Sequence, residues 1–238
     1  MKKAKMIRVA FVIGGYPPEE HKRRADVALS YSSEEVQVGI VDVKASPYFY
    51  GMTPAEIQAC CAGVYRELQA SGRPRVRCRR AAGDPRAWGR RGESGRRYPG
   101  RGADGSASIV GDKFGAIVYH ESQLGFLRAI VRRYGMEERM VGFGVSGFDL
   151  PDLAANHDKV VENFVREARR LIGLGAEIIF PMGISQCPVH IKPDWLQKEL
   201  GVPVVGAIGA PIRMAALLVG LGLKQSRVRW PKSRTGEK

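Results

Sequence analysis

Short apolar runs alternate with loops and amphipathic segments along residues 174–223, and this alternation is the clearest structural signal in the chain. The predicted elements are, in order, a strand over 177–180 that stops at Pro181, a loop over 182–187, a helix over 194–200, a strand over 202–206 and a helix over 212–221 with Pro211 in its first turn. Strands and helices that alternate in this way predict a parallel sheet with covering helices. Ligands of such sheets bind beyond the carboxyl ends of the strands, so we expect the active surface at the loops 182–187 and 206–210. The last helix is apolar on nearly all sides, which predicts that it is buried.

The same alternation runs through most of the remaining chain. It predicts strands over 7–13, 36–43 and within 108–119, a strand and loop over 141–147, and helices over 19–31, 53–70, 121–134 and 153–172. The predicted fold class is therefore α/β, with parallel-type sheets flanked by helices. A chain of 238 residues has room for one large domain or for two lobes of about 100 residues each.

Residues 71–105 interrupt this order, because they contain no Leu, Ile, Met or Phe and cannot bury enough apolar surface to offset their ordering entropy. Two interpretations remain open. The segment is a disordered Arg/Gly-rich arm that binds RNA, with Trp88 and Tyr98 available for base stacking. Alternatively it is a frameshifted stretch, since Arg, Gly, Pro and Ala have GC-rich codons. Codons can be chosen for 95–105 that, read one base later, encode a near copy of the segment from Gly201, and this favours the frameshift.

The net charge of +14 is concentrated in two segments. Residues 71–105 hold eleven arginines against three acidic residues, a net charge of +8, and the tail from Lys224 holds six basic residues against Glu237, a net charge of +5. The rest of the chain is left with a net charge of about +1. The basic character therefore belongs to these segments and not to the predicted fold.

No apolar run approaches the ~20 residues that a membrane span needs. The basic start at Met1 is not followed by a signal-peptide core, and four cysteines in a chain of this length do not form a disulfide framework. We therefore expect a cytoplasmic protein with no membrane partner.

Cys187 is the candidate reactive residue, because it follows a predicted strand end within the sequence MGISQCP. Backbone N–H groups or a helix N-terminus at such a place lower the pKa of a thiol and create a nucleophile or base. The alternative is an inert, partly buried cysteine. Cys187 and His190 form a C-x-x-H pair without a second pair in register, so we expect no metal site.

Two further motifs predict no chemistry. The sequence GFGVSG at 142–147 matches the dinucleotide-binding pattern, but Pro151 follows where that pattern needs a helix, so a strand and a loop are predicted. His21, His120 and His157 are isolated in the sequence and are expected at the surface or as helix caps.

The chain resembles the aspartate/glutamate/hydantoin racemase superfamily, particularly its hydantoin-racemase-like branch. The matching segments are IRVAFVIGG, GDKFGAIVYHE with LRAIVRRYG, the helix leading into GAEIIFP, and GVPVVGAIGAPIRMAALLVGLGL with SRVRWPKS. Together they cover most of the chain except 71–105, and they occur in the order and spacing of that superfamily.

The resemblance implies two similar α/β lobes that face each other across a cleft at the carboxyl ends of their strands. The corresponding domains are a first lobe over 1–112, a second lobe over 113–205, a C-terminal helix over 206–223 that packs back on the first lobe, and a basic tail over 224–238. Enzymes of this superfamily need no cofactor and are often oligomeric, so we expect no cofactor and a homo-oligomer.

The resemblance also implies the chemistry. One thiolate removes an α-proton while a thiol on the opposite face donates one, and each cysteine follows a strand of its own lobe. The second cysteine of the superfamily aligns nearer Gly183 than Cys187, and the first would fall within 71–105, where only Cys78 exists. We assign the catalytic role to Cys187 and the substrate contacts to the two predicted loops: Gly14, Gly15, Tyr16, Met182, Gly183, Ile184 and Ser185.

The sequence thus predicts a cofactor-independent racemase or isomerase-like protein that moves an α-proton of an amino acid, a hydantoin or a related small carboxylate or imide. Two alternatives stay open. One is a catalytically inactive relative that binds a small metabolite, and the other is nucleic-acid binding through 71–105, which is the less expected of the two.

Overall fold

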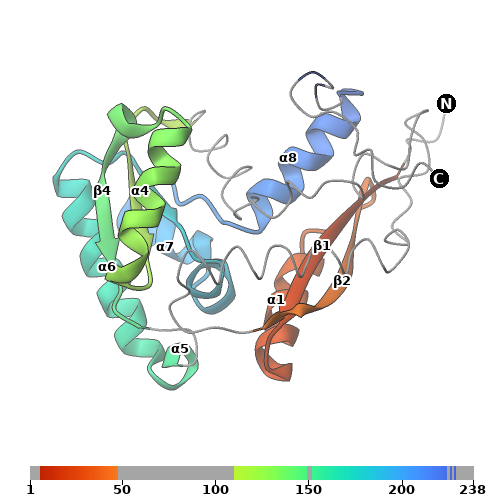
Figure 1. Ribbon diagram of the computed structural model, residues 1–238, viewed down its shortest axis with the longest axis horizontal. Helices are drawn as coiled ribbons and strands as arrows, with labels where there is room; N and C mark the ends of the chain where they lie inside the picture. Colours follow the sequence, from red (N-terminus) through yellow and green to blue (C-terminus); the bar gives the residue numbers. More distant parts are fainter. Residues whose placement is uncertain (1–5, 48–109, 149–151, 224–225, 227, 229–238) are drawn as a thin grey trace. The chain divides into compact units, whose positions relative to one another are not determined.

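The computed structural model describes residues 6–47, 110–148 and 152–223, together with 226 and 228 (Figure 1). The chain forms two compact units. Of the described residues, unit 1 contains 6–47 and those from Ile212 onward, and unit 2 contains 110–148 and 152–211. The predicted helix over 53–70 and the segment 71–105 lie outside the described residues, and the predicted domain boundaries stay a prediction.

Unit 1 is built on two parallel strands, β1 (Ile7–Gly15) and β2 (Val36–Pro47), which pair from Ile7 opposite Val36 onward. Helix α1 (Pro18–Leu29) connects the strands and packs on both. Pro18 begins the helix, and acidic residues in the first turn complement the helix dipole. The strands and the helix predicted from this part of the sequence are confirmed, and β2 extends four residues beyond the predicted end.

Helix α8 (Gly209–Gly220) corrects one prediction. Ile212 and Ala216 are buried, but Leu217 is 55% and Leu218 42% exposed. A sequence that is apolar on all sides predicts burial on all sides, whereas in the structure only one face of this helix is covered by protein. The loop predicted over 206–210 is also shorter than expected, because α8 begins at Gly209.

Unit 2 contains a three-stranded parallel sheet in the order β4-β3-β5. Its strands are β3 (Phe114–Val118), β4 (Met140–Val145) and β5 (Ile178–Pro181). The central strand β3 is buried at all five positions, as is typical of a strand with neighbours on both sides and helices on both faces. A single parallel bridge between Ile179 and Val204 adds to the β5 edge, so the strand predicted over 202–206 is reduced to one bridge.

The helical elements of unit 2 connect and cover these strands. They are η3 (Glu121–Gln123), α4 (Leu124–Arg133), η4 (Glu137–Arg139), α5 (Asp152–Ala155), α6 (His157–Gly173), η5 (Ser185–His190) and α7 (Pro193–Leu200). Alternate residues of β5 point to two apolar clusters: Ile179 packs with Phe164 and Leu171 of α6, and Ile178 and Phe180 pack on the other side with Phe114. The two clusters hold the sheet between its covering layers.

Two details of unit 2 differ from the predictions. The helix predicted over 153–172 is two helices, α5 and α6, because the backbone leaves helical geometry at Asn156 (φ −118°, ψ 31°). The loop predicted over 182–187 is partly helical, since η5 begins at Ser185. By contrast, the sequence GFGVSG is a strand followed by a loop, as predicted, with Gly147 at φ 82°.

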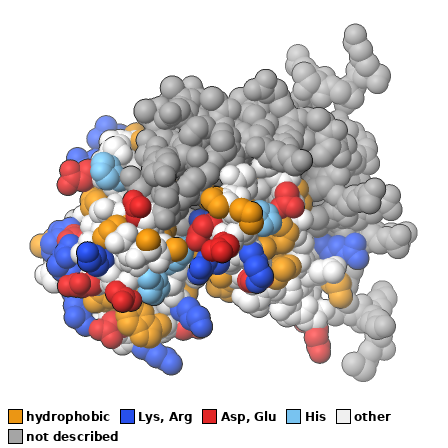
Figure 2. Space-filling view, turned by 90° about the horizontal axis from the view of Figure 1, so that it is seen from below, with side chains coloured by type: hydrophobic (Ala, Val, Ile, Leu, Met, Phe, Trp, Pro, Cys, Tyr) orange, Lys and Arg blue, Asp and Glu red, His pale blue; other side chains and the backbone are white. Residues whose placement is uncertain are grey.

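Among the described residues, no helix is both long and apolar enough to cross a membrane. On the face seen in Figure 2, basic and acidic side chains of the described residues are intermixed. This mixture agrees with the near-neutral charge of the chain outside its two basic segments.

Candidate active site

The buried polar residues of unit 2, Ser146, Ser185 and Gln186, lie at the carboxyl edge of its sheet. Tyr119 directly follows β3, Ser146 directly follows β4, and the segment from Met182 follows β5. Backbone hydrogen bonds join these three segments beyond the strand ends: Ser146 N–H donates to Val118 O (2.9 Å) and Met182 N–H donates to Ile117 O (2.8 Å). Because parallel strands bring their carboxyl ends to one edge, residues distant in the sequence meet here.

Tyr119 lies against the loop after β5. Its hydroxyl oxygen accepts a hydrogen bond from the backbone N–H of Ser185 at 2.8 Å, in a buried position. A Cβ atom built on Gly183 would overlap the Tyr119 ring and hydroxyl. The Tyr119 ring fills the space that a side chain at residue 183 would need, so only glycine fits at this position.

A second buried polar pair lies beside this loop. The Gln186 side-chain amide donates to the Ser146 hydroxyl, and the Asn163 amide donates to the Ser146 carbonyl oxygen at 2.9 Å. Gln186 is fully buried, and its Oε1 has no hydrogen-bond partner among the described residues. A buried amide oxygen without a partner costs free energy, so this atom is a point at which a bound group could add a hydrogen bond.

Cys187, the predicted catalytic residue, lies in a different environment from the one that its sequence position suggested. Its side chain is fully buried in the apolar cluster on the α6 side of the sheet, together with Ile191 and Leu196. Burial raises the pKa of the Cys187 thiol well above its usual range, because the apolar surroundings disfavour the thiolate. The thiol is therefore neutral near pH 7, and its catalytic role stays a prediction.

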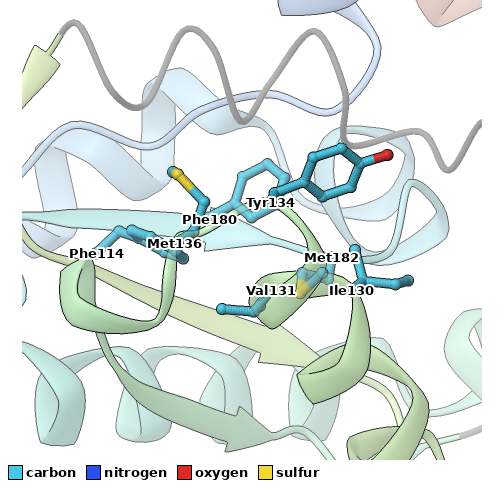
Figure 3. A pocket seen from close by; sticks show the side chains of 7 residues that line it. All are labelled: Phe114, Ile130, Val131, Tyr134, Met136, Phe180 and Met182. Carbon is cyan, nitrogen blue, oxygen red and sulfur yellow. The ribbon is translucent and has the colours of Figure 1, made fainter.

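The other loop residues that were predicted as substrate contacts differ in how deeply they are buried. Gly183 and Ser185 are buried, while Met182 and Ile184 are partly buried. Met182 lines a small apolar pocket between α4 and the sheet, together with Phe114, Phe180 and Tyr134 (Figure 3). The pocket offers apolar contact, whereas the polar groups of this edge are those of Tyr119, Ser146 and Gln186.

The predicted contacts in unit 1, Gly14, Gly15 and Tyr16, lie at the carboxyl end of β1. The Tyr16 ring stacks on the guanidinium of Arg24, which lies 3.8 Å from the ring centroid. Arg24 is fully buried and donates to a carboxylate oxygen of Glu20 at 2.6 Å. This edge of unit 1 therefore carries a buried cation in contact with a tyrosine.

The histidines differ from one another. His120 caps η3 by accepting from Ser122 N–H at 3.2 Å, which confirms the predicted capping role for this residue. His21 is isolated in the sequence but pairs with Asp42 at 2.6 Å in the structure. No three His, Cys, Asp or Glu side chains of the described segments are grouped as metal ligands.

Sequence reasoning missed Tyr119, Ser146, Gln186 and Arg24. A signal existed for the first two, because each is the first polar side chain after an apolar strand. No sequence signal indicated Gln186 or Arg24, whose burial depends on the surrounding elements.

The comparisons with known proteins agree with this architecture. No family model matches the chain. A hydantoin racemase of Pseudomonas sp. (strain NS671) is 25% identical over 123 residues, which are 52% of this chain and 49% of the relative, so the match spans about half the length of that protein. Two solved structures share the fold. An allantoin racemase from Klebsiella pneumoniae has a TM-score of 0.71 at 16% identity and covers 96% of this chain and 95% of its own. For an allantoin racemase from Pseudomonas fluorescens the TM-score is 0.73 at 18% identity, and the match covers 98% of this chain and 99% of that protein.

The fold is thus the parallel α/β architecture that these two allantoin racemases share. The sequence similarity to a protein named hydantoin racemase agrees with the resemblance of the sequence motifs.

Proposed function

We propose that this protein is a cofactor-independent racemase or isomerase that moves the α-proton of a small carboxylate or cyclic imide, with hydantoins as the first substrate class to test. The observation that carries the proposal is the similarity of 123 residues to a protein named hydantoin racemase. The fold shared with two allantoin racemases supports it.

The proposed reaction needs no change of oxidation state. A base takes the proton from the α-carbon, the electron pair of the C–H bond delocalises into the adjacent carbonyl, and an acid returns a proton to the opposite face. Groups that do this must be held about one substrate width apart and shielded from water. The carboxyl edge of the unit 2 sheet offers buried hydrogen-bonding groups in fixed positions, which suits such a reaction.

Cys187 enters this proposal in its neutral form. A thiol whose pKa is raised by burial keeps its proton, so it could serve as a proton donor but not as the base at neutral pH. The substrate contacts predicted from the sequence stay proposals for each unit by itself, at Gly14–Tyr16 in unit 1 and at 182–185 in unit 2.

The proposal is tested by following the α-proton in deuterated water. The full chain is incubated with single enantiomers of 5-substituted hydantoins, of allantoin and of aspartate and glutamate. Loss of the α-proton signal is followed by NMR, and the enantiomer ratio by chiral chromatography. Each rate is compared with buffer alone, because hydantoins also exchange this proton without a protein.

We expect exchange accompanied by racemisation for at least one cyclic imide, at a rate proportional to protein concentration. If no compound exchanges faster than in buffer, the proposed function is wrong. Binding without exchange, seen as a rise in melting temperature on addition of a compound, would then identify a metabolite-binding protein without catalysis.

A further inference from the structure

The space above Gly183 is the starting observation. Gly183 is buried, and the three atoms nearest to a Cβ built at this position all belong to Tyr119. The loop after β5 therefore has no room for a side chain of its own at residue 183. The group that occupies this place comes from the end of the neighbouring strand β3.

The Tyr119 hydroxyl is held in a defined position. On the loop side, the Ser185 N–H donates to its oxygen at 2.8 Å. On the backbone side, the Tyr119 carbonyl oxygen accepts from Gly147 N–H at 2.9 Å, which ties the residue to the segment after β4. A hydroxyl fixed in this way has little freedom to lose when a substrate binds, and this is what proton transfer requires.

The ionisable side chains at this edge differ in their surroundings and in their hydrogen bonds. Cys187 and Tyr119 both belong to the buried cluster on the α6 side of the sheet, but the Cys187 thiol lies among apolar side chains, whereas the Tyr119 hydroxyl has a backbone hydrogen-bond donor. His120 is turned to its own helix cap and binds Ser122. Of these three side chains, Tyr119 is the one that combines an ionisable oxygen with hydrogen bonds to the segments after both neighbouring strands.

We propose that the Tyr119 hydroxyl beside Gly183, and not the Cys187 thiol, is the acid/base group of unit 2. This assignment rests on the proposed function. As an acid, the phenol breaks its O–H bond as the proton forms a C–H bond with the substrate carbanion, and the phenolate oxygen keeps the Ser185 N–H as a hydrogen-bond donor. In the reverse direction the phenolate takes the α-proton and returns to the phenol, so protons and electrons balance over a cycle.

Tyr119→Phe is the test, because this change removes the hydroxyl and keeps the ring above Gly183. Racemisation is measured with the compound that the full chain turns over, and the matched control is Tyr31→Phe, the same change in the turn after α1. We expect Tyr119→Phe to lower kcat by about 100-fold or more, since an acid/base group contributes on the order of 10²–10⁴-fold. KM should change by less than about 3-fold, and Tyr31→Phe should retain the rate of the unmodified chain.

If Tyr119 had only a structural role, Tyr119→Phe would change the melting temperature, but the folded variant would keep the kcat of the unmodified chain. Thermal unfolding is therefore recorded for both variants. If Tyr119→Phe racemises within a few-fold of the unmodified chain, the assignment is wrong while the proposed function stands. If the variant and the Tyr31→Phe control lose activity equally, the assignment is also wrong. If the unmodified chain itself exchanges no α-proton, the proposed function fails and the assignment fails with it.

Discussion

The carboxyl edges of the two sheets each place a tyrosine directly after a parallel strand, Tyr16 after β1 and Tyr119 after β3. Their environments are opposite in character. Tyr16 stacks on the buried guanidinium of Arg24, so its edge contains a cation. Tyr119 accepts a hydrogen bond from a backbone N–H, beside a neutral amide and a neutral thiol.

This difference shows that a tyrosine directly after a parallel strand can lie in two different electrostatic environments. The unit 1 edge contains a buried ion pair between Arg24 and Glu20 in contact with the Tyr16 ring. The unit 2 edge contains neutral hydrogen-bonding groups that are held in fixed positions. Two substitutions test this comparison, and a third extends it to the amino-terminal edge of the unit 2 sheet, in order of decreasing expected effect.

Gly183→Ala tests whether Tyr119 and Gly183 are matched to each other. We expect a loss of about 3 kcal/mol in the free energy of unfolding, because the new methyl group overlaps the buried ring. The double variant Gly183→Ala with Tyr119→Ala should be more stable than the sum of the single losses predicts, by about 2 kcal/mol. Urea unfolding measures all three.

The matched control for this cycle is Gly125→Ala in α4, where a Cβ meets no atom within 4 Å. We expect this variant to be unchanged or slightly more stable, because alanine favours a helix over glycine. Additive effects of the two substitutions at 183 and 119 would contradict the packing described here.

Arg24→Met tests the charged edge of unit 1. The substitution keeps much of the side-chain volume and removes the partner of Glu20, so we expect a loss of about 2 kcal/mol. Arg23→Met is the control on the same helix, since Arg23 lies 3.5 Å from the same carboxylate but its side chain is 48% exposed. This control should cost less than about 0.5 kcal/mol. Equal losses in chemical denaturation would show that the buried pair does not stabilise unit 1.

Glu177→Gln tests the opposite, amino-terminal edge of the unit 2 sheet. The backbone N–H of Asp112, and then that of Lys113, lower the pKa of Glu177 below its ordinary value of 4.5. A lowered pKa in the folded state means that the carboxylate stabilises the fold above its unfolded pKa and that this contribution is lost as pH falls through the folded pKa.

The urea midpoint of the unmodified chain should therefore fall further between pH 7 and pH 3 than that of Glu177→Gln. The difference should be small, because the carboxylate is exposed to solvent. Glu162→Gln, an exposed position on α6, should follow the unmodified chain. A larger fall for Glu177→Gln than for the unmodified chain would reverse the sign and contradict the assignment of these hydrogen bonds.

Most of the fold could be predicted from local patterns in the sequence. The apolar run at 7–13, the segment 36–43 and the amphipathic segment at 121–134 contain their own signals, because strand and helix periodicity depends on nearby residues. Gly201 after α7 adopts a left-handed conformation with φ 70°, as glycine at a helix end predicts. The break at Asn156 was missed, because the residues around it continue a helical pattern.

The site was less predictable than the fold. The rule that ligands bind at the carboxyl ends of parallel strands predicted the loops as the site, which stays a prediction, and Cys187 was singled out because it follows a strand end. Its burial could not be predicted, since the residues that enclose it come from α6, α7 and the segment before α7. A thiol has the same sequence signature at the surface and in a core.

The sequence by itself determined the order of strands and helices, the division of charge and the family that the chain resembles. Only the tertiary structure decided that Tyr119 lies on Gly183, that Gln186 reaches Ser146, and that one face of α8 stays exposed. The physical reason is that periodicity and turn chemistry act over a few residues. Packing and pKa depend instead on which distant side chains share the same small volume.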